Sequence, residues 1–331
     1  MRYPSGMVSL GYFLSSEEFE PRELVRQAGL AEAVGFERLW ISDHFHPWNR
    51  EQGNSPFVWS VIGALSERTT LPITTAVTCP TVRLHPAVVA QAAATAAVQC
   101  PGGFTLGVGS GEALNEHIFG DPWPAADVRL SMLEEAVELI RALHRGGPVN
   151  YSGKHYTVDQ AEIFTLPEQP VPIYVSGFGP KAARLAGRIG DGFAAVMPDP
   201  DLVRTFRESG GGDRPAQGGF KVCYAPDEDD AVATAHRLWP NEQLPGELAQ
   251  VLPTPRHFEQ ASTLVTPQSV AENVPCGPDA QRYVDSLMEF VDAGYDEVYV
   301  QQIGPNQNRF FEFWTEEVLP RIPEPAKLGS R

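Results

Sequence analysis

The sequence is short of positive charge and has no long apolar run. Its 331 residues carry 25 Lys and Arg against 42 Asp and Glu, a net charge of −17. This balance argues against nucleic acids and anionic membrane surfaces as partners, because both need clustered cations. The apolar runs fall short of the ~20 residues that span a bilayer. Met1–Pro4 also lacks the apolar segment of a secretory signal. We therefore expect a cytoplasmic protein that acts on a small molecule.

Cysteine is also scarce. Cys79, Cys100, Cys223 and Cys276 are widely spaced, none forms a CxxC pair, and none lies at ligand spacing from a histidine. This pattern argues against a disulfide framework and against a zinc site. We expect buried, reduced thiols and no metal.

What the sequence does contain is a regular alternation of strand and helix patterns. Apolar or β-branched runs predict eight strands, at residues 8–13, 38–41, 72–78, 104–109, 172–177, 192–196, 220–224 and 297–301. Helical spacing between and after them predicts eight helices, at residues 21–34, 57–67, 87–100, 128–144, 181–189, 230–238, 279–293 and 309–319. The alternation predicts an α/β fold with one domain over residues 1–331, a (β/α)8 TIM barrel.

Two segments interrupt this rhythm, after the fourth and seventh strands. Residues 151–156 are typical of a hairpin insertion. Residues 240–275 hold many prolines and no steady period, which favours a lid or a substrate-specific insertion.

A cluster of reactive side chains follows the second predicted strand. Asp43, His44, His46 and Trp48 lie within six residues, at a strand end where side chains are both fixed and reachable. The alternative is that Asp43 caps the next turn and His44 is an ordinary polar loop residue.

A glycine-rich segment, residues 107–116, follows the fourth predicted strand. It lacks the Lys-Ser/Thr of a phosphate-binding loop, and Glu112 stands where a dinucleotide fingerprint has its third glycine. Glycines at 109 and 111, with Ser110 between them, would let a flat ring lie against the backbone. Glu112 either complements a helix dipole or faces His44 as an acid–base partner, and the presence of both groups favours the second interpretation.

A third segment, residues 175–181, has glycines directly before a predicted helix. Free backbone N–H groups at a helix start can bind an anion, although a plain strand-to-helix turn has the same pattern.

These segments resemble the luciferase-like superfamily, and within it the coenzyme F420-dependent glucose-6-phosphate dehydrogenase family. The similar segments are SDHFxPW from Ser42, GVGxGEALNE from Gly107 and AGRxGDGF from Ala186, and the resemblance runs from about residue 11 to 320. It implies a homodimeric barrel that binds F420 at the carboxyl ends of the strands and transfers a hydride from a substrate C–H.

The resemblance also assigns roles to residues. It implies that His44 is the base, Glu112 the acid, and Trp48 the residue that closes over the substrate. Residues 176–179 would hold the coenzyme phosphate, and Ala76–Val77 would be a cis peptide behind the ring. The expected cofactor contacts are Asp43, Ala76, Val77, Gly109, Ser110, Gly111, Asn115, Ser176, Gly177, Phe178 and Gly179.

The sequence departs from this family where its members hold the substrate phosphate with two lysines and an arginine. The corresponding residues here are Asp199, Ala249 and Asn273. Because a lost cation weakens phosphate binding and an anion repels it, we expect an unphosphorylated alcohol or sugar, with Met197 and Asp199 at the substrate. The alternatives are a sugar-phosphate dehydrogenase, a reductase that uses reduced F420, an FMN-dependent monooxygenase, and a barrel that binds its cofactor without catalysis.

Overall fold

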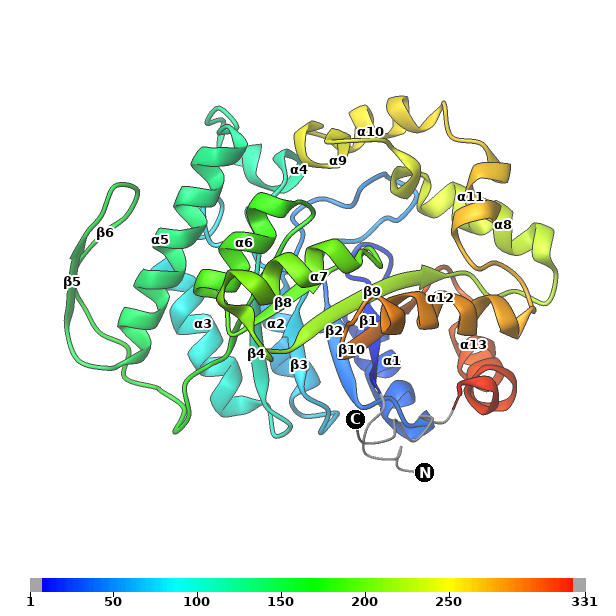
Figure 1. Cartoon of the computed structure of the whole chain (residues 1–331), viewed down its shortest axis with the longest axis horizontal. Coiled ribbons are helices and arrows are strands. Elements are labelled where there is room, and N and C mark those ends of the chain that lie inside the picture. Colours follow the sequence, from blue (N-terminus) through cyan, green and yellow to red (C-terminus); the bar gives the residue numbers. More distant parts are fainter. Residues whose placement is uncertain (1–7, 324–331) are drawn as a thin grey trace.

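A closed barrel of eight parallel strands forms the centre of the molecule (Figure 1). The computed structural model describes residues 8–323. The strand order around the barrel is β1-β10-β9-β8-β7-β4-β3-β2, which confirms the predicted fold. The barrel strands are β1 Ser9–Leu14, β2 Arg38–Ile41, β3 Ile73–Thr75, β4 Phe104–Val108, β7 Ile173–Ser176, β8 Gly192–Ala195, β9 Ala216–Val222 and β10 Glu297–Gln302.

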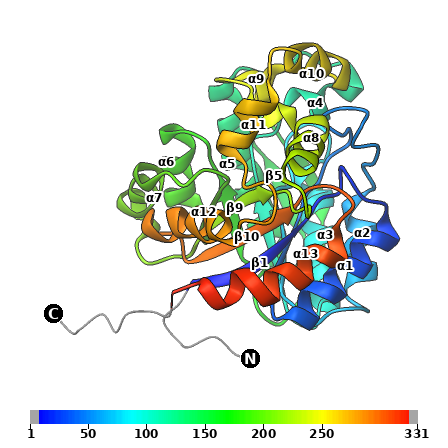
Figure 2. The same ribbon diagram turned by 90° about the vertical axis from the view of Figure 1, so that its right-hand side faces the viewer.

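Helices surround the barrel (Figures 1 and 2). They are α1 Pro21–Val34, α2 Val58–Leu65, α3 Pro86–Gln99, α4 Ala113–Glu116, α5 Ala126–His144, α6 Pro180–Ile189, α7 Pro200–Phe206, α8 Glu228–Leu238, α12 Ala280–Asp292 and α13 Gln307–Phe313. Short 3-10 or π segments are His117–Phe119, Arg207–Gly211, Pro240–Gln243, Trp314–Val318 and Leu319–Arg321. Within residues 8–323, every helix is too short or too polar to cross a membrane.

Both predicted insertions have regular structure. Strands β5 Val149–Ser152 and β6 Thr157–Ala161 pair antiparallel and project from the side of the barrel (Figure 1). Residues 240–275 form helical segments above the carboxyl ends of the strands, among them α9 Leu248–Val251, α10 Pro255–Ser262 and α11 Pro267–Asn273. Pro255 and Pro267 occupy the first turns of α10 and α11, where a missing N–H costs little.

Aromatic and polar side chains fill the barrel below its carboxyl end. The rings of Trp40 and Tyr299 stack with centroids 4.3 Å apart, and the indole N–H of Trp40 donates to Gln217 at 2.9 Å. Strand β9 begins four residues before the predicted start. Gly218 and Gly219 break the apolar pattern there, and in the fold a Cβ at Gly219 would lie 2.4 Å from the Trp40 ring. The site described next lies above this packed interior.

Candidate active site

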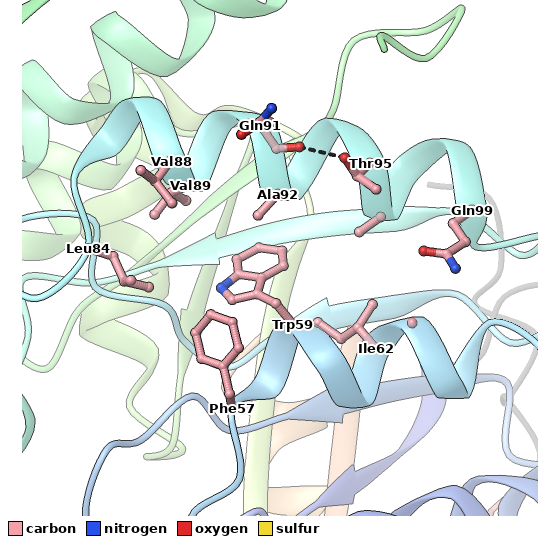
Figure 3. Close-up of a pocket in the computed structure, with 12 residues that line it drawn as sticks. Phe57, Trp59, Ile62, Leu84, Val88, Val89, Gln91, Ala92, Thr95 and Gln99 are labelled. Carbon is pink, nitrogen blue, oxygen red and sulfur yellow. Dashed lines mark hydrogen bonds between the residues drawn. The ribbon is translucent and has the colours of Figure 1, made fainter.

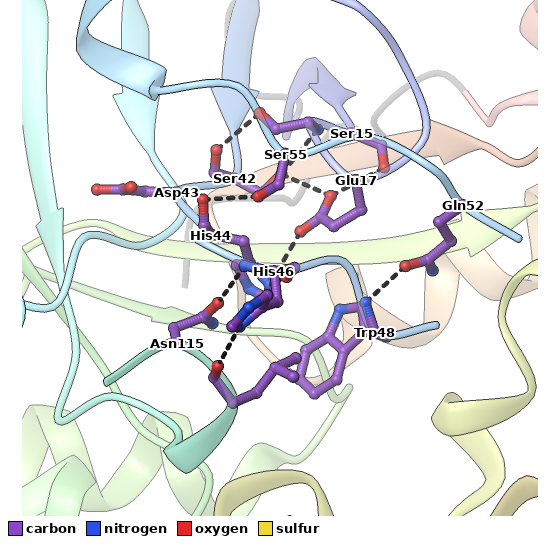
Figure 4. Close-up of polar contacts among 12 residues, drawn as sticks. Ser15, Glu17, Ser42, Asp43, His44, His46, Trp48, Gln52, Ser55 and Asn115 are labelled. Atoms are coloured by element: carbon purple, nitrogen blue, oxygen red, sulfur yellow. Dashed lines mark hydrogen bonds and ion pairs between the residues drawn. The ribbon is translucent and has the colours of Figure 1, made fainter. Parts of the chain in front are cut away.

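The loop after β2 carries His44 to the carboxyl end of the barrel. The imidazole is largely buried, with 12% of the side chain exposed. The hydroxyl of Ser55 donates to the backbone oxygen of His44 at 2.7 Å, which fixes the loop at this residue (Figure 4). Because the backbone is held and the ring is mostly enclosed, His44 has a defined position for proton transfer.

Glu112 comes from the neighbouring loop after β4 and occupies the position before α4. Its side chain makes no capping hydrogen bond to that helix. Instead, Oε2 lies 3.6 Å from Nε2 of His44.

The environment of Glu112 favours a proton carrier. Burial raises the pKa of this carboxyl to about 6, while nearby His44 lowers it and the charges of Glu17, Glu116 and Glu242 raise it. A carboxyl that titrates near neutral pH beside an imidazole can hold or release a proton under ordinary conditions. The structure thus brings together the predicted acid and base, from two separate strands.

A second carboxylate, Glu17, lies on the other side of the His44 ring. Its Oε1 is 3.5 Å from Nδ1 of His44, and its Oε2 accepts from the hydroxyls of Ser42 at 2.8 Å and Ser15 at 3.0 Å (Figure 4). Glu17 is 2% exposed. Glu17 could not be recognised as a site residue from the sequence, because Ser15–Glu18 has the composition of a helix start, whereas α1 begins at Pro21.

Asn115 links the two loops that carry His44 and Glu112. Its Oδ1 accepts from the backbone N–H of Phe45 at 2.9 Å and of His46 at 3.1 Å, and its Nδ2 donates to Oε2 of Glu112 at 3.2 Å. Asn115 thus keeps the base and the carboxyl in one arrangement. Its predicted contact with the cofactor stays a prediction.

Asp43 is fully enclosed by its own partners. Arg83 donates to Oδ1 at 2.8 Å and Thr78 donates to Oδ2 at 2.7 Å, while Glu116 accepts from the backbone N–H of Arg83 at 2.6 Å. The carboxylate does not cap the following turn, as one interpretation of the sequence had it. It anchors the start of the His44 loop to the segments after β3 and β4, and its contact with F420 stays a prediction.

Trp48 joins the site to the second insertion. Its ring centroid lies 5.1 Å from that of His44 and 5.0 Å from that of Phe258 in α10. Trp48 is 8% exposed and belongs to an apolar cluster that also contains Trp239. The insertion therefore packs directly on the loop that carries the predicted base.

The segments after β3 and β4 approach each other closely. The Ala76–Val77 peptide is cis, as the resemblance implied. A Cβ on Gly109 would lie 2.8 Å from Cγ2 of Val77, and Gly111 has φ +79 with Cys79 Sγ 2.5 Å from its Cβ position. Glycine is thus required at 109 and 111 for these segments to approach, and Ser110 between them is half-buried. A flat ring can lie against backbone of this kind.

The segment from Ser176 to Gly179 leads into α6. The N–H of Gly177 donates to Ala194 O at 3.1 Å, but the N–H groups of Phe178 and Gly179 donate to no residue within 8–323. Free N–H groups before a helix of this length match the predicted phosphate contact, which stays a prediction.

Met197 and Asp199 follow β8. Met197 is 39% exposed. The Asp199 carboxylate accepts from the backbone N–H of Asp201 at 2.8 Å and of Leu202 at 3.4 Å, so it caps α7. The helix cap accounts for an aspartate at position 199. The predicted contacts of Met197 and Asp199 with the substrate stay predictions.

Comparison with known proteins shows the family of the chain. The model of the luciferase-like monooxygenase family matches residues 7–297. The chain belongs to this family. It is 36% identical to an F420-dependent glucose-6-phosphate dehydrogenase of Microbacterium testaceum over 94% of this chain and 96% of that one. It is also 36% identical to a protein of the same name from Mycobacterium avium, over 95% of this chain and 98% of that one. Within the luciferase-like proteins, the chain is thus a member of the F420-dependent oxidoreductases.

The fold is also similar to a solved structure, an F420-dependent secondary alcohol dehydrogenase in complex with an F420-acetone adduct. The identity is 33%, the TM-score is 0.87, and the similarity covers 96% of this chain and 99% of that one. The similarity thus extends to a protein named for a secondary alcohol as well as to those named for glucose 6-phosphate.

Proposed function

We propose that this protein is an F420-dependent dehydrogenase that acts on the CH–OH group of a small, unphosphorylated alcohol or sugar. The observation that carries the proposal is the 3.6 Å approach of His44 Nε2 to Glu112 Oε2, beside the cis peptide after β3 and the glycines after β4. When bound, F420 supplies a deazaflavin ring that accepts or returns a hydride. The residues of this chain then position the alcohol, take its hydroxyl proton at His44 and hold a second proton at Glu112.

His44 is proposed to take the hydroxyl proton of the alcohol at Nε2. Glu17 at Nδ1 would stabilise the imidazolium that results, because a buried carboxylate favours the charged ring. Glu112 is proposed to hold the second proton of the site, and Trp48 to exclude water over the substrate. The same residues serve the reverse reaction, in which reduced F420 drives the reduction of a carbonyl compound.

The basic side chains around the site support an unphosphorylated substrate. The guanidinium of Arg83 pairs with Asp43 at 2.8 Å, and the ammonium of Lys221 pairs with Glu242 at 3.0 Å. A cation already paired with a carboxylate is a weaker phosphate ligand than a free one. A sugar-phosphate dehydrogenase is the second candidate, because the relatives at 36% identity carry that name.

Two measurements test the proposal. The protein is titrated with F420 and with FMN, and a panel of alcohols, sugars and sugar phosphates is then assayed by loss of the absorbance of oxidised F420. We expect binding of F420 and not of FMN, with turnover of a neutral alcohol or sugar. Binding of FMN alone would favour a monooxygenase, and turnover of glucose 6-phosphate alone would favour the second candidate.

We also propose that the protein is a homodimer that pairs through α2 and α3. A hollow of about 280 Å³ lies between these helices (Figure 3). Phe57 and Val88, which line it, are 53% and 54% exposed. Apolar side chains gathered on one outer face are typical of a subunit interface.

A further inference from the structure

Lys221 and Glu242 form an ion pair that joins the barrel to its second insertion. Lys221 is the second-last residue of β9, and Glu242 lies in the first turn of the insertion, Pro240–Gln243. The ammonium Nζ is 3.0 Å from Oε1 of Glu242. The lysine side chain is 11% exposed and the glutamate 31%, so the pair is sheltered but still reachable.

Aromatic rings place this ion pair at the carboxyl end of the barrel. The ammonium of Lys221 lies 4.4 Å from the ring centroid of Trp239 and 6.0 Å from that of Phe13. Phe13 packs in the barrel interior with Trp40, and Ala76 of the cis peptide contacts the same cluster. Lys221 therefore points over the barrel interior, toward the surface proposed to hold the deazaflavin ring.

Glu242 also lies close enough to the acid–base pair to affect it. Its negative charge is one of those that raise the pKa of Glu112. The predicted acid, the predicted base and the ion pair thus share one region, bounded by the loops after β1, β2, β4 and β9 and by the insertion.

We propose that Glu242, held by Lys221, determines the substrate class of the enzyme: it selects neutral compounds with a second hydroxyl group, such as a free sugar, and rejects phosphorylated ones. This inference rests on the proposed function. The reacting CH–OH lies at His44 and Glu112, and the second hydroxyl meets the ion pair.

The hydrogen-bonding capacity of the ion pair fits such a hydroxyl. Within residues 8–323, Oε2 of Glu242 has no partner, and the ammonium of Lys221 has no ion-pair partner besides Glu242. A hydroxyl can donate to the free carboxylate oxygen and accept from the ammonium at the same time. A phosphate can accept only from the ammonium, and it meets the negative charge of Glu242.

The experiment compares Glu242→Gln with the wild type and with Glu259→Gln. Glu259 lies in the same insertion, but its carboxylate pairs with Arg50 at 2.8 Å. Glucose and glucose 6-phosphate are titrated separately into each protein, and the dissociation constants are followed by tryptophan fluorescence, since Trp239 contacts Lys221. We expect wild type to prefer glucose by about tenfold or more, and Glu242→Gln to reduce that preference about tenfold.

The control variant Glu259→Gln should keep the wild-type preference. The inference is overturned if Glu242→Gln and the wild type show the same preference, if the wild type prefers glucose 6-phosphate, or if it binds neither sugar. Binding of F420, measured in the same preparations, separates this result from the proposed function. If the protein binds F420 and oxidises an alcohol but Glu242→Gln leaves the sugar preference unchanged, only the present inference is contradicted. If the protein binds no F420, the proposed function is contradicted.

Discussion

The two ring nitrogens of His44 each face a carboxylate: Nδ1 lies 3.5 Å from Glu17, and Nε2 lies 3.6 Å from Glu112. Glu17 is held in turn by the hydroxyls of Ser15 and Ser42. A carboxylate on the far nitrogen of a catalytic imidazole orients the ring and stabilises its charged form. We therefore expect Glu17→Gln to lower kcat about 10- to 100-fold without changing F420 affinity. Glu23→Gln, which alters an exposed ion pair with Arg26, is the control, and equal kcat values for the two variants would remove Glu17 from proton transfer.

Loss of the base itself should have a larger effect. We expect His44→Ala to lower kcat ~10²–10⁴-fold, because the alcohol then loses its proton acceptor. The dissociation constant for F420 should stay within about twofold of the wild-type value, since proton transfer and coenzyme binding use different groups. Steady-state kinetics with the best alcohol and fluorescence titration of F420 check the two expectations. Unchanged turnover would show that another group accepts the proton.

Glu112 should leave a signature in the pH profile. Burial raises the pKa of its carboxyl to about 6, so the group is protonated below that pH and ionised above it. If Glu112 acts as the acid, only its protonated form is active, so kcat/KM for alcohol oxidation should fall as the pH rises through 6. Glu112→Gln cannot titrate, so its profile should lack the limb near pH 6 and its maximum should be lower. A profile with the same limb in the variant would mean that a different group produces it.

The sequence predicts the part of the site that depends on local pattern. His44 follows a predicted strand within one continuous segment, so a strand end could be predicted there. The glycines before Glu112 likewise lie in one continuous segment, so a tight turn could be predicted. Glu17 and Glu242 could not be predicted in the same way. Their roles depend on which side chains face them, Ser42 for one and Lys221 for the other, and these partners are distant in the chain. Asp199 shows the converse, because its carboxylate is used locally as a helix cap.

The partly buried carboxylate of Glu18 ties Trp239, the residue directly before the insertion, to the barrel, and this contact should be measurable as stability. Glu18 accepts from the indole N–H of Trp239 at 2.5 Å and from the N–H of Gly304 at 2.7 Å. Trp239→Phe removes one donor, and we expect the free energy of unfolding to fall by about 1–3 kcal/mol at pH 8. Trp59→Phe is the matched control, because the indole N–H of Trp59 is buried without a partner among residues 8–323.

The effect of Trp239→Phe should also depend on pH. Burial raises the pKa of Glu18 from 4.5 to about 7 in the folded protein. The unfolded chain therefore ionises at lower pH than the folded protein, and the free energy of unfolding falls as the pH rises from 4.5 to about 7. Removal of a donor raises this pKa further, and the additional loss therefore appears mainly above pH 7. Chemical denaturation at pH 5 and pH 8 measures both values. A decrease in the free energy of unfolding of Trp239→Phe that is equal at the two pH values, or no greater than that of Trp59→Phe, would contradict this account of Glu18.

The apolar face between α2 and α3 leads to a prediction about assembly. If a second copy of the chain covers Phe57 and Val88, a charge at either position is buried against apolar surface on pairing and must weaken it. We expect Phe57→Glu and Val88→Glu each to shift the molar mass from two chains to one, as measured by light scattering during gel filtration. Leu264→Glu is the control, because Leu264 is 86% exposed on the insertion, away from this face. A wild type with the mass of one chain, or variants that keep the mass of two, would show that α2 and α3 are not where the subunits meet.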